Sequence, residues 1–126
     1  MPKYVDGFVL SVPKTKLGEY RQIARGAGKV WKKHGALQYF ECVGEDLDPK
    51  MMDGMKFFKF PTMAKTKPGE VVVFSFIVFK SRAHRDKVNA KVMQDPFMTG
   101  PKMKDRPMPF DMKRTAYGGF TTIVEG

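Results

Sequence analysis

The sequence contains very few of the residues that build disulfides and transition-metal sites. Among its 126 residues there are one cysteine, Cys42, and two histidines. A single cysteine excludes an intramolecular disulfide and a cysteine-rich zinc site. The two histidines have no carboxylate or thiolate at the spacing that metal ligands usually show. We therefore expect neither a metal ion nor a cofactor.

Long apolar runs and low-complexity segments are also missing. No apolar run approaches the roughly 20 residues of a membrane-spanning helix. The first residues, Met-Pro-Lys-Tyr-Val-Asp, contain no apolar region of a signal peptide. Apolar residues make up 42% of the chain, which is enough for one buried core at this length. We expect a single domain over residues 1–126, a cytoplasmic location and no membrane partner.

Positive charge is in excess. Lys and Arg total 23 against 13 Asp and Glu, a net charge of +10. Such a field attracts anions of many kinds. The basic residues are scattered over the whole chain and form no arm or block. This distribution favours a solvated basic surface over a dedicated nucleic-acid site, and it leaves a small anionic ligand open.

One stretch, residues 71–79, is apolar on both of its faces if it forms a strand. It reads Val-Val-Val-Phe-Ser-Phe-Ile-Val-Phe, so Ser75 is its single polar residue. Successive side chains of a strand point to opposite faces. One face would therefore carry Val72, Phe74, Phe76 and Val78. Both faces of such a strand must be covered.

Hydropathy patterns and turn signals predict the order of the elements. We expect strands at 4–12, 36–44, 71–79 and 114–124, and helices at 14–33 and 81–95. This β-α-β-β-α-β order is that of the ferredoxin-like α+β fold, with a four-stranded antiparallel sheet. The irregular stretch 45–69 is long for a loop and rich in Phe and Met, so we expect it to cover a pocket.

Three glycines fall inside the predicted helix at 14–33, and two of them lie close together in its second half. Gly26 and Gly28 each cost helix stability on the order of 1 kcal/mol relative to alanine. Close packing of the helix or room for a ligand would compensate this cost. We expect close packing.

The predicted fold leaves one face of the sheet open, because both helices cover the other. An exposed apolar patch of this kind marks an interface, and the simplest cover is a second copy, sheet against sheet. Burying Val72, Phe74, Phe76 and Val78 would contribute roughly 6–12 kcal/mol per protomer, before the cost of association is subtracted. We expect a homodimer with these residues at its interface.

Several motifs together resemble one protein family. They are YVDGFVL at 4–10, GKVWKKHGAL at 28–37, YFECVG at 39–44, EVVVFS at 70–75, VNAKVM at 88–93, PFDMKR at 109–114 and YGGF at 117–120. These motifs, spread over nearly the whole chain, are similar to those of the YbaA-like family of uncharacterised bacterial proteins. The resemblance implies the dimeric α+β barrel superfamily, in which two ferredoxin-like sheets close into a barrel. It implies no activity and no catalytic residues.

Members of that superfamily include cofactor-independent oxygenases and commonly use a pocket between sheet and helices. Our catalytic candidates are His34, Glu41 and Arg114, and whether the protein is an enzyme stays open. The further candidates for the pocket are Asp6, Trp31, Tyr39, Cys42, Asp111 and Tyr117. Several have structural alternatives: His34 could cap its helix, Cys42 could be an inert buried thiol, and Asp111 could pair with Arg114.

Three functions follow from these observations. The first is binding of a small anionic or apolar molecule between the sheet, the helices and residues 45–69. The second is a cofactor-independent oxygenase-like enzyme. The third is RNA binding, because RNA-recognition domains share this element order and place aromatic residues on strands one and three. Val72 and Val73 replace the basic residue and the glycine of that motif, which makes nucleic acid an unlikely partner.

Overall fold

The computed structural model describes residues 2–50 and 54–126. Its strands are β1 (Tyr4–Pro13), β2 (Gln38–Val43), β3 (Glu70–Phe79) and β4 (Ala116–Thr121). Its α-helices are α1 (Leu17–Lys33), α2 (Phe60–Met63), α3 (Arg82–Met93), α4 (Pro96–Thr99) and α5 (Pro101–Lys104). Two 3₁₀ turns, η1 (Lys14–Lys16) and η2 (Met112–Arg114), precede α1 and β4.

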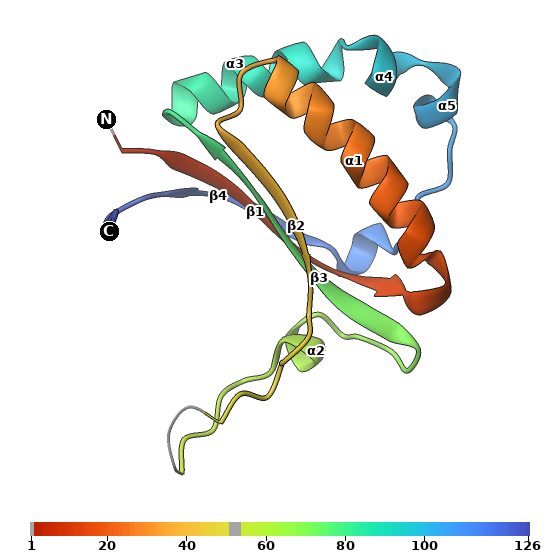
Figure 1. Cartoon of the computed structure of the whole chain (residues 1–126), viewed down its shortest axis with the longest axis vertical. Helices are drawn as coiled ribbons and strands as arrows, with labels where there is room; N and C mark the ends of the chain where they lie inside the picture. Colours follow the sequence, from red (N-terminus) through yellow and green to blue (C-terminus); the bar gives the residue numbers. More distant parts are fainter. Residues whose placement is uncertain (1, 51–53) are drawn as a thin grey trace.

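The four strands form one antiparallel sheet in the order β2-β3-β1-β4. Helix α1 connects β1 to β2, and α3 begins the connection from β3 to β4. Figure 1 shows α1, α3, α4 and α5 on one face of the sheet. The predicted ferredoxin-like α+β fold is therefore confirmed, with α4 and α5 as additions. The β1–β3 register pairs Phe8 with Ser75.

The core fills the space between the helices and the sheet, in two clusters. One gathers the buried Ile77 and Phe79 of β3 under α3. The other gathers Leu10 and Val12 of β1, with Val73, under the first half of α1. The alternate residues of β3 thus face the helices, as the strand period requires.

Helix α1 lies so close to its neighbours that two of its positions need glycine. A Cβ at Gly26 would come within 2.6 Å of the ring of Phe97, and one at Gly28 within 2.9 Å of the ring of Tyr39. Both distances are shorter than real side-chain contacts allow. The expected close packing of this helix is confirmed.

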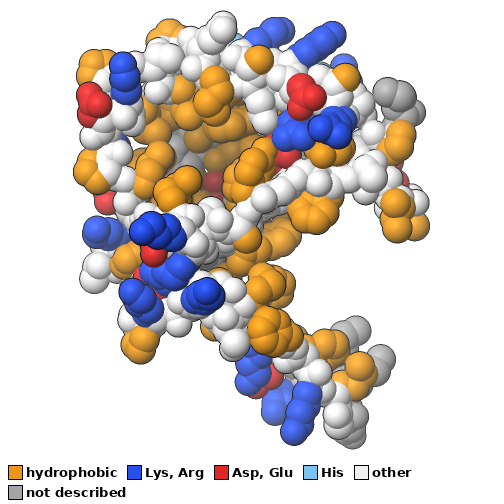
Figure 2. All heavy atoms as spheres, turned by 180° about the vertical axis from the view of Figure 1, so that it is seen from behind, with side chains coloured by type: hydrophobic (Ala, Val, Ile, Leu, Met, Phe, Trp, Pro, Cys, Tyr) orange, Lys and Arg blue, Asp and Glu red, His pale blue; other side chains and the backbone are white. Residues whose placement is uncertain are grey.

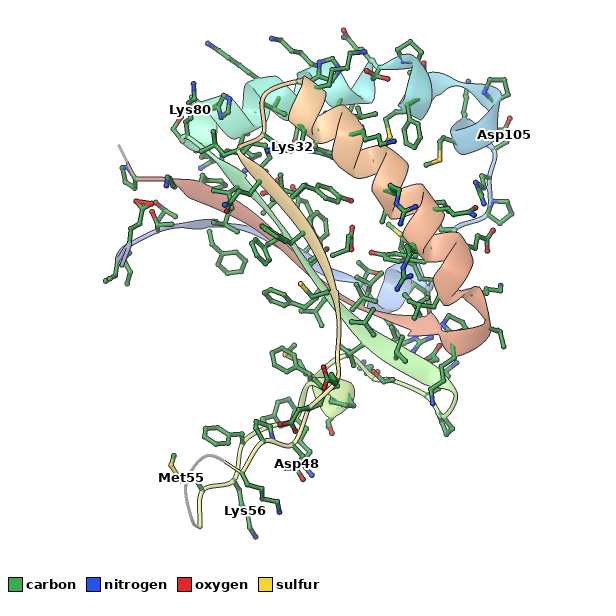
Figure 3. All side chains as sticks on the ribbon, viewed as in Figure 1. Lys32, Asp48, Met55, Lys56, Lys80 and Asp105 are labelled. Carbon is green, nitrogen blue, oxygen red and sulfur yellow. The ribbon has the colours of Figure 1, made fainter. Side chains whose placement is uncertain are left out.

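The other face of the sheet is apolar and largely uncovered. We call it the open face; among its residues, Phe40, Phe74 and Phe120 are all more than 40% exposed. Figure 3 shows aromatic side chains projecting from the sheet on this side. The rings of Phe40 and Phe76 lie 5.1 Å apart, and those of Phe74 and Phe76 lie 5.7 Å apart. A continuous aromatic patch therefore crosses β2 and β3.

Two expectations about this face were wrong. Val72 is only 4% exposed, because the segment after α2 covers its end of the sheet. This segment is bonded to Ser11, the neighbour of Val72 on β1: the Ser11 hydroxyl lies 2.8 Å from Thr66 Oγ1 and donates to the Ala64 carbonyl at 3.3 Å. Cys42 is exposed on the open face beside Phe74, whereas we had expected a buried thiol.

Residues 45–50 and 54–63 form an arm that stands off the domain. Figure 1 shows it leaving β2 and returning through α2, on the side of the sheet opposite to α1. The prediction that residues 45–69 cover a pocket between sheet and helices is therefore wrong. The Phe and Met content of the segment indicated that it covers another surface. It could not show on which side of the sheet that surface lies.

Candidate functional site

An apolar cavity of about 290 Å³ lies between α1, the helix-facing side of the sheet and residues 96–115. Figure 2 shows a hollow walled by hydrophobic side chains, with acidic atoms visible inside it. The sheet contributes Phe8, Leu10, Tyr39, Glu41, Ser75, Ile77 and Tyr117, α1 contributes Tyr20, Ile23, Ala24, Ala27 and Trp31, and the covering segment contributes Met98, Met103, Met108, Phe110, Met112 and Thr115. The cover is thus rich in methionine, a flexible side chain that fills irregular space.

Among the described side chains of the cavity wall, Glu41 is the one that carries a charge, and two tyrosines hold it. Tyr20 donates from its hydroxyl to Glu41 Oε1 and Tyr39 donates to Oε2, both at 2.7 Å. Burial, and then the charge of Glu41, raise the pKa of both tyrosines. Both hydroxyls therefore stay protonated, and the carboxylate keeps a fixed orientation with a second lone pair free on each oxygen.

Strand geometry explains why these groups meet. Tyr39 and Glu41 are two residues apart on β2, so they share its helix-facing side. Ser75, the single polar residue of β3's apolar run, lies directly opposite Glu41 in the β2–β3 register and is buried. The cavity therefore presents a carboxylate and a hydroxyl side by side in otherwise apolar surroundings.

A second polar cluster lies around the buried Asp6. Its Oδ2 accepts hydrogen bonds from Asn89 at 3.4 Å and from the hydroxyl of Tyr117 at 3.3 Å, and its Oδ1 lies 3.5 Å from Arg85 Nη1. Asn89 in turn accepts a hydrogen bond from the Trp31 indole at 3.0 Å. Burial raises the pKa of Asp6, and the charge of Arg85 opposes that shift. This cluster ties α3 to β1, β4 and α1.

His34 lies outside the cavity, at the end of α1. Its Nε2 is 2.7 Å from Asp95 Oδ2. The other oxygen of Asp95 accepts a hydrogen bond from the backbone N–H of Phe97 and so caps α4. That bond, and then the one with His34, lower the pKa of Asp95 to about 2. The placement matches the structural alternative for His34, and the catalytic candidacy loses its geometric basis.

Arg114 also lies outside the cavity, in an ion cluster at the start of β3. It donates from Nη1 to Glu70 Oε1 at 2.6 Å and from Nη2 to Oε2 at 2.8 Å. It also donates to Asp111 at 3.1 Å and to the Lys65 carbonyl at 2.9 Å. The bond from Arg114 is the main reason that the pKa of Glu70 falls to about 2. Arg114 and Asp111 thus hold three chain segments together.

Of the predicted residues, the structure brings Glu41, Tyr39, Trp31 and Tyr117 to one cavity. Asp6 lies behind Tyr117, and the remaining candidates face elsewhere. Within residues 2–50 and 54–126, no three His, Cys, Asp or Glu side chains gather as metal ligands would. None of the described helices is long and apolar enough to cross a membrane.

Sequence reasoning missed several residues of the site: Tyr20, Ser75, Arg85, Asn89 and the methionines of the cover. Two signals could have found the first two. Tyr20 shares the apolar stripe of its helix with Ala24, and Ser75 is the single polar residue in a strand that is apolar on both faces. No local signal marks Arg85 or Asn89, whose partners lie far away in sequence.

The fold and the cavity define a class: a ferredoxin-like α+β protein with one carboxylate set in an apolar cavity between sheet and helices. A family model described as "Protein of unknown function (DUF1428)" matches residues 3–112. The uncharacterized protein YbaA of Escherichia coli strain K12 is 43% identical over 124 residues, which cover 98% of each chain, and YbaA of Shigella flexneri matches equally well. The chain belongs to this family, and the resemblance to YbaA-like proteins is confirmed.

A solved structure, the de novo designed protein Foldit4, covers 98% of this chain and 99% of its own. Its sequence identity is 14% and its TM-score is 0.43. A TM-score this low carries no argument. The fold therefore rests on the sheet order and the helix placement described above.

Proposed function

We propose that the protein binds a small molecule in the cavity, one with an apolar body and a cationic or hydrogen-bond-donating group that meets Glu41. The observation that carries this proposal is the carboxylate, held on both oxygens by Tyr20 and Tyr39 in an otherwise apolar cavity. Ligand sites typically combine apolar walls with a few placed polar groups. The cavity volume lies at the lower end of such sites, which suits a small ligand.

The charge of the cavity argues against an anionic ligand. The net charge of +10 belongs to the whole chain, and the one charge among the described side chains of the cavity wall is negative. An anion beside Glu41 would meet like-charge repulsion in surroundings that screen it poorly. An apolar or cationic ligand is therefore favoured over the anionic one that the composition left open.

The geometry favours binding over oxygenase-like catalysis. Of the three catalytic candidates, Glu41 alone reaches the cavity, while His34 contacts Asp95 and Arg114 pairs with Glu70. We place the binding in the cytoplasm, where the exposed thiol of Cys42 would stay reduced.

The experiment compares two ligands of similar shape and opposite charge, phenethylamine and 3-phenylpropionate, by calorimetry and by the fluorescence of Trp31, which lines the cavity. We expect the amine to bind at least tenfold more tightly than the acid, because it alone pairs with Glu41. Glu41→Gln should remove this preference, and Tyr20→Phe should weaken it. Glu45→Gln, at an exposed acidic position, is the matched control.

Two results would contradict the proposal. Equal binding of the acid and the amine by the native protein is one. An unchanged preference in Glu41→Gln, with the fold intact by circular dichroism, is the other. Because Tyr20→Phe leaves the carboxylate in place, it keeps the test informative if the Gln variant fails to fold.

We also propose that the protein is a homodimer whose open faces meet. The open-face residues Phe74, Phe76 and Val78 carry no charge, and Phe40 and Phe120 extend the patch to β2 and β4. Phe74→Lys should therefore give a monomer in sedimentation experiments, while Ile123→Lys, at a 91% exposed position near the C-terminus, should not. A native protein that is monomeric at all concentrations would contradict the homodimer.

The same face gives RNA binding little support. Phe8 of β1 faces the helices and stacks on Tyr117 with the ring centroids 4.6 Å apart, so it is not available to a base. No strand residue on the open face is Lys or Arg. Base-stacking platforms usually combine aromatic side chains with a positively charged groove, and these strands supply only the aromatic part.

A further inference from the structure

We propose that the arm forms the second half of the interface with a second copy of the chain. By arm we mean residues 45–50 and 54–63. The inference rests on the proposed pairing of open faces. It adds the arm to the interface, whereas that pairing requires contacts between the two sheets only. It is independent of the ligand in the cavity.

Both ends of the arm are fixed to the open-face side of the sheet. At its start, the Gly44 N–H donates to the Val72 carbonyl at 2.8 Å, which extends the β2–β3 ladder. At its end, Ala64 is buried, and its carbonyl accepts the hydrogen bond from Ser11. Between these ends, Lys59 and Asp48 form an ion pair of 3.3 Å that joins the two limbs. The arm is therefore fixed to the sheet at both ends, and the ion pair holds its two limbs together.

The arm exposes five large apolar side chains, which alternate with exposed charged ones such as Lys56 and Lys59. The apolar ones are Met55, Phe57, Phe58, Phe60 and Met63, and Phe58 is 76% exposed. Figure 3 shows the labelled Met55 and Lys56 far from the body of the domain. Soluble monomers rarely expose a contiguous apolar patch of this size. The arm thus has the composition of an interface and has no cover from the rest of the described chain.

The areas favour a joint interface. At 150–250 Å² per large side chain, the three exposed rings of the open face present roughly 300 Å². The five apolar side chains of the arm present roughly 500 Å² by the same measure. A specific interface of standard size takes about 800 Å² from each partner. The most exposed rings of the sheet fall short of this area, and the arm supplies the difference.

The position of the arm selects a second copy as the occupant. The arm and the open face lie on the same side of the sheet (Figure 1), so a copy seated on the open face must lie beside the arm. By two-fold symmetry each copy then receives the arm of the other. Two sheets and two arms would cover the exposed phenylalanines of the open face and of the arm.

The experiment measures the dimer dissociation constant by analytical ultracentrifugation over a concentration series. The test variant is Phe57→Ser with Phe58→Ser. Its matched control is Ile123→Ser with Val124→Ser, which removes two even more exposed apolar side chains from the C-terminal segment. We expect the arm variant to raise the dissociation constant at least tenfold and the control to leave it unchanged. Because the arm stands off the core, the unfolding of a monomeric Phe74→Lys background should not change in either variant.

The outcomes separate this inference from the pairing itself. An arm variant that dimerises as tightly as the native chain, while Phe74→Lys is monomeric, overturns the role of the arm and keeps the pairing. A monomeric native chain overturns both. A monomeric chain that sediments with anionic vesicles through Phe57 and Phe58 would show that the arm binds a membrane surface in place of a second copy. None of these results touches the ligand proposal, which is tested by the amine and the acid.

Discussion

Replacing Arg114 with methionine should destabilise the fold and leave ligand binding intact. In the native structure its guanidinium makes two short bonds to Glu70 and further bonds to Asp111 and the Lys65 carbonyl. Methionine keeps most of the side-chain volume and removes every one of these donors. The carboxylate of Glu70, whose side chain is 10% exposed, would then lose its charged partner.

The magnitude follows from the pKa of Glu70, which falls from 4.5 to about 2, chiefly because of the bond from Arg114 and further because of Lys67. A shift of that size corresponds to about 3 kcal/mol at most. Because Lys67 contributes part of this shift and the pair, at the end of β3, keeps some exposure to solvent, we reduce the expected loss to about 2 kcal/mol. A carboxylate with a lowered pKa stabilises the fold above its unfolded pKa and loses that effect as the pH falls. The loss in the variant should therefore be full at pH 7 and should shrink from pH 4.5 toward pH 2.

Urea unfolding, followed by circular dichroism at pH 7, 5, 4 and 3 and at a fixed protein concentration, measures this. Arg114→Lys should recover part of the stability, because lysine keeps the charge and loses the two-pronged geometry. Arg106→Met is the control: it removes an exposed pair with Glu19 and should cost about 0.5 kcal/mol or less. A loss of the same size at pH 7 and pH 3 would refute the reasoning, and so would a loss at pH 7 no larger than that of Arg106→Met.

Three further predictions concern the core, the buried ion pair and the open face. Gly26→Ala should lower the free energy of unfolding by about 1–3 kcal/mol, since its Cβ would overlap a ring of α4. Gly18→Ala, with nothing within 4 Å of the added Cβ, should instead stabilise the helix by about 0.5–1 kcal/mol. Equal effects of the two substitutions would contradict the packing argument. Arg85→Met should cost about 3 kcal/mol at neutral pH, because it leaves the buried carboxylate of Asp6 unpaired. This loss should decrease as the pH falls, since burial already raises the pKa of Asp6; a loss that grows in acid would contradict it. The Cys42 thiol should react with a maleimide in the monomeric Phe74→Lys background and be protected in the native dimer; equal rates would count against pairing through the open face.

Much of the fold could be predicted from the sequence, because it rests on local patterns. Strand alternation and the apolar stripe of α1 place the elements in order, and the strand period alone separates Ile77, which faces the helices, from Phe76 on the open face. The glycines of α1 indicated a close approach before any neighbour was known. Val72 broke the pattern because α2, a short helix inside an irregular stretch, covers that end of the open face.

The candidate site could be predicted only in part, because residue type does not reveal a partner that is distant in sequence. Glu41 and Tyr39 could be placed together from strand spacing. Asp95, which contacts His34, lies 61 residues away, and Glu70, which pairs with Arg114, lies 44 residues away. The sequence therefore could not show that these two candidates lie outside the cavity. The direction of the arm could not be predicted either. Its composition shows that it is rich in apolar residues, but it does not show on which side of the sheet the arm lies.

The position of Glu41 has one more consequence. A second hollow of about 290 Å³ lies on the other flank of α1, and it shares Tyr20, Tyr39 and Glu41 with the cavity while adding Arg21 and Arg25 to its own wall. Glu41 therefore belongs to the walls of two hollows, one mainly apolar and one that also contains two arginines. A ligand in either hollow would therefore meet Glu41, and a substitution at this position changes the walls of both hollows at once.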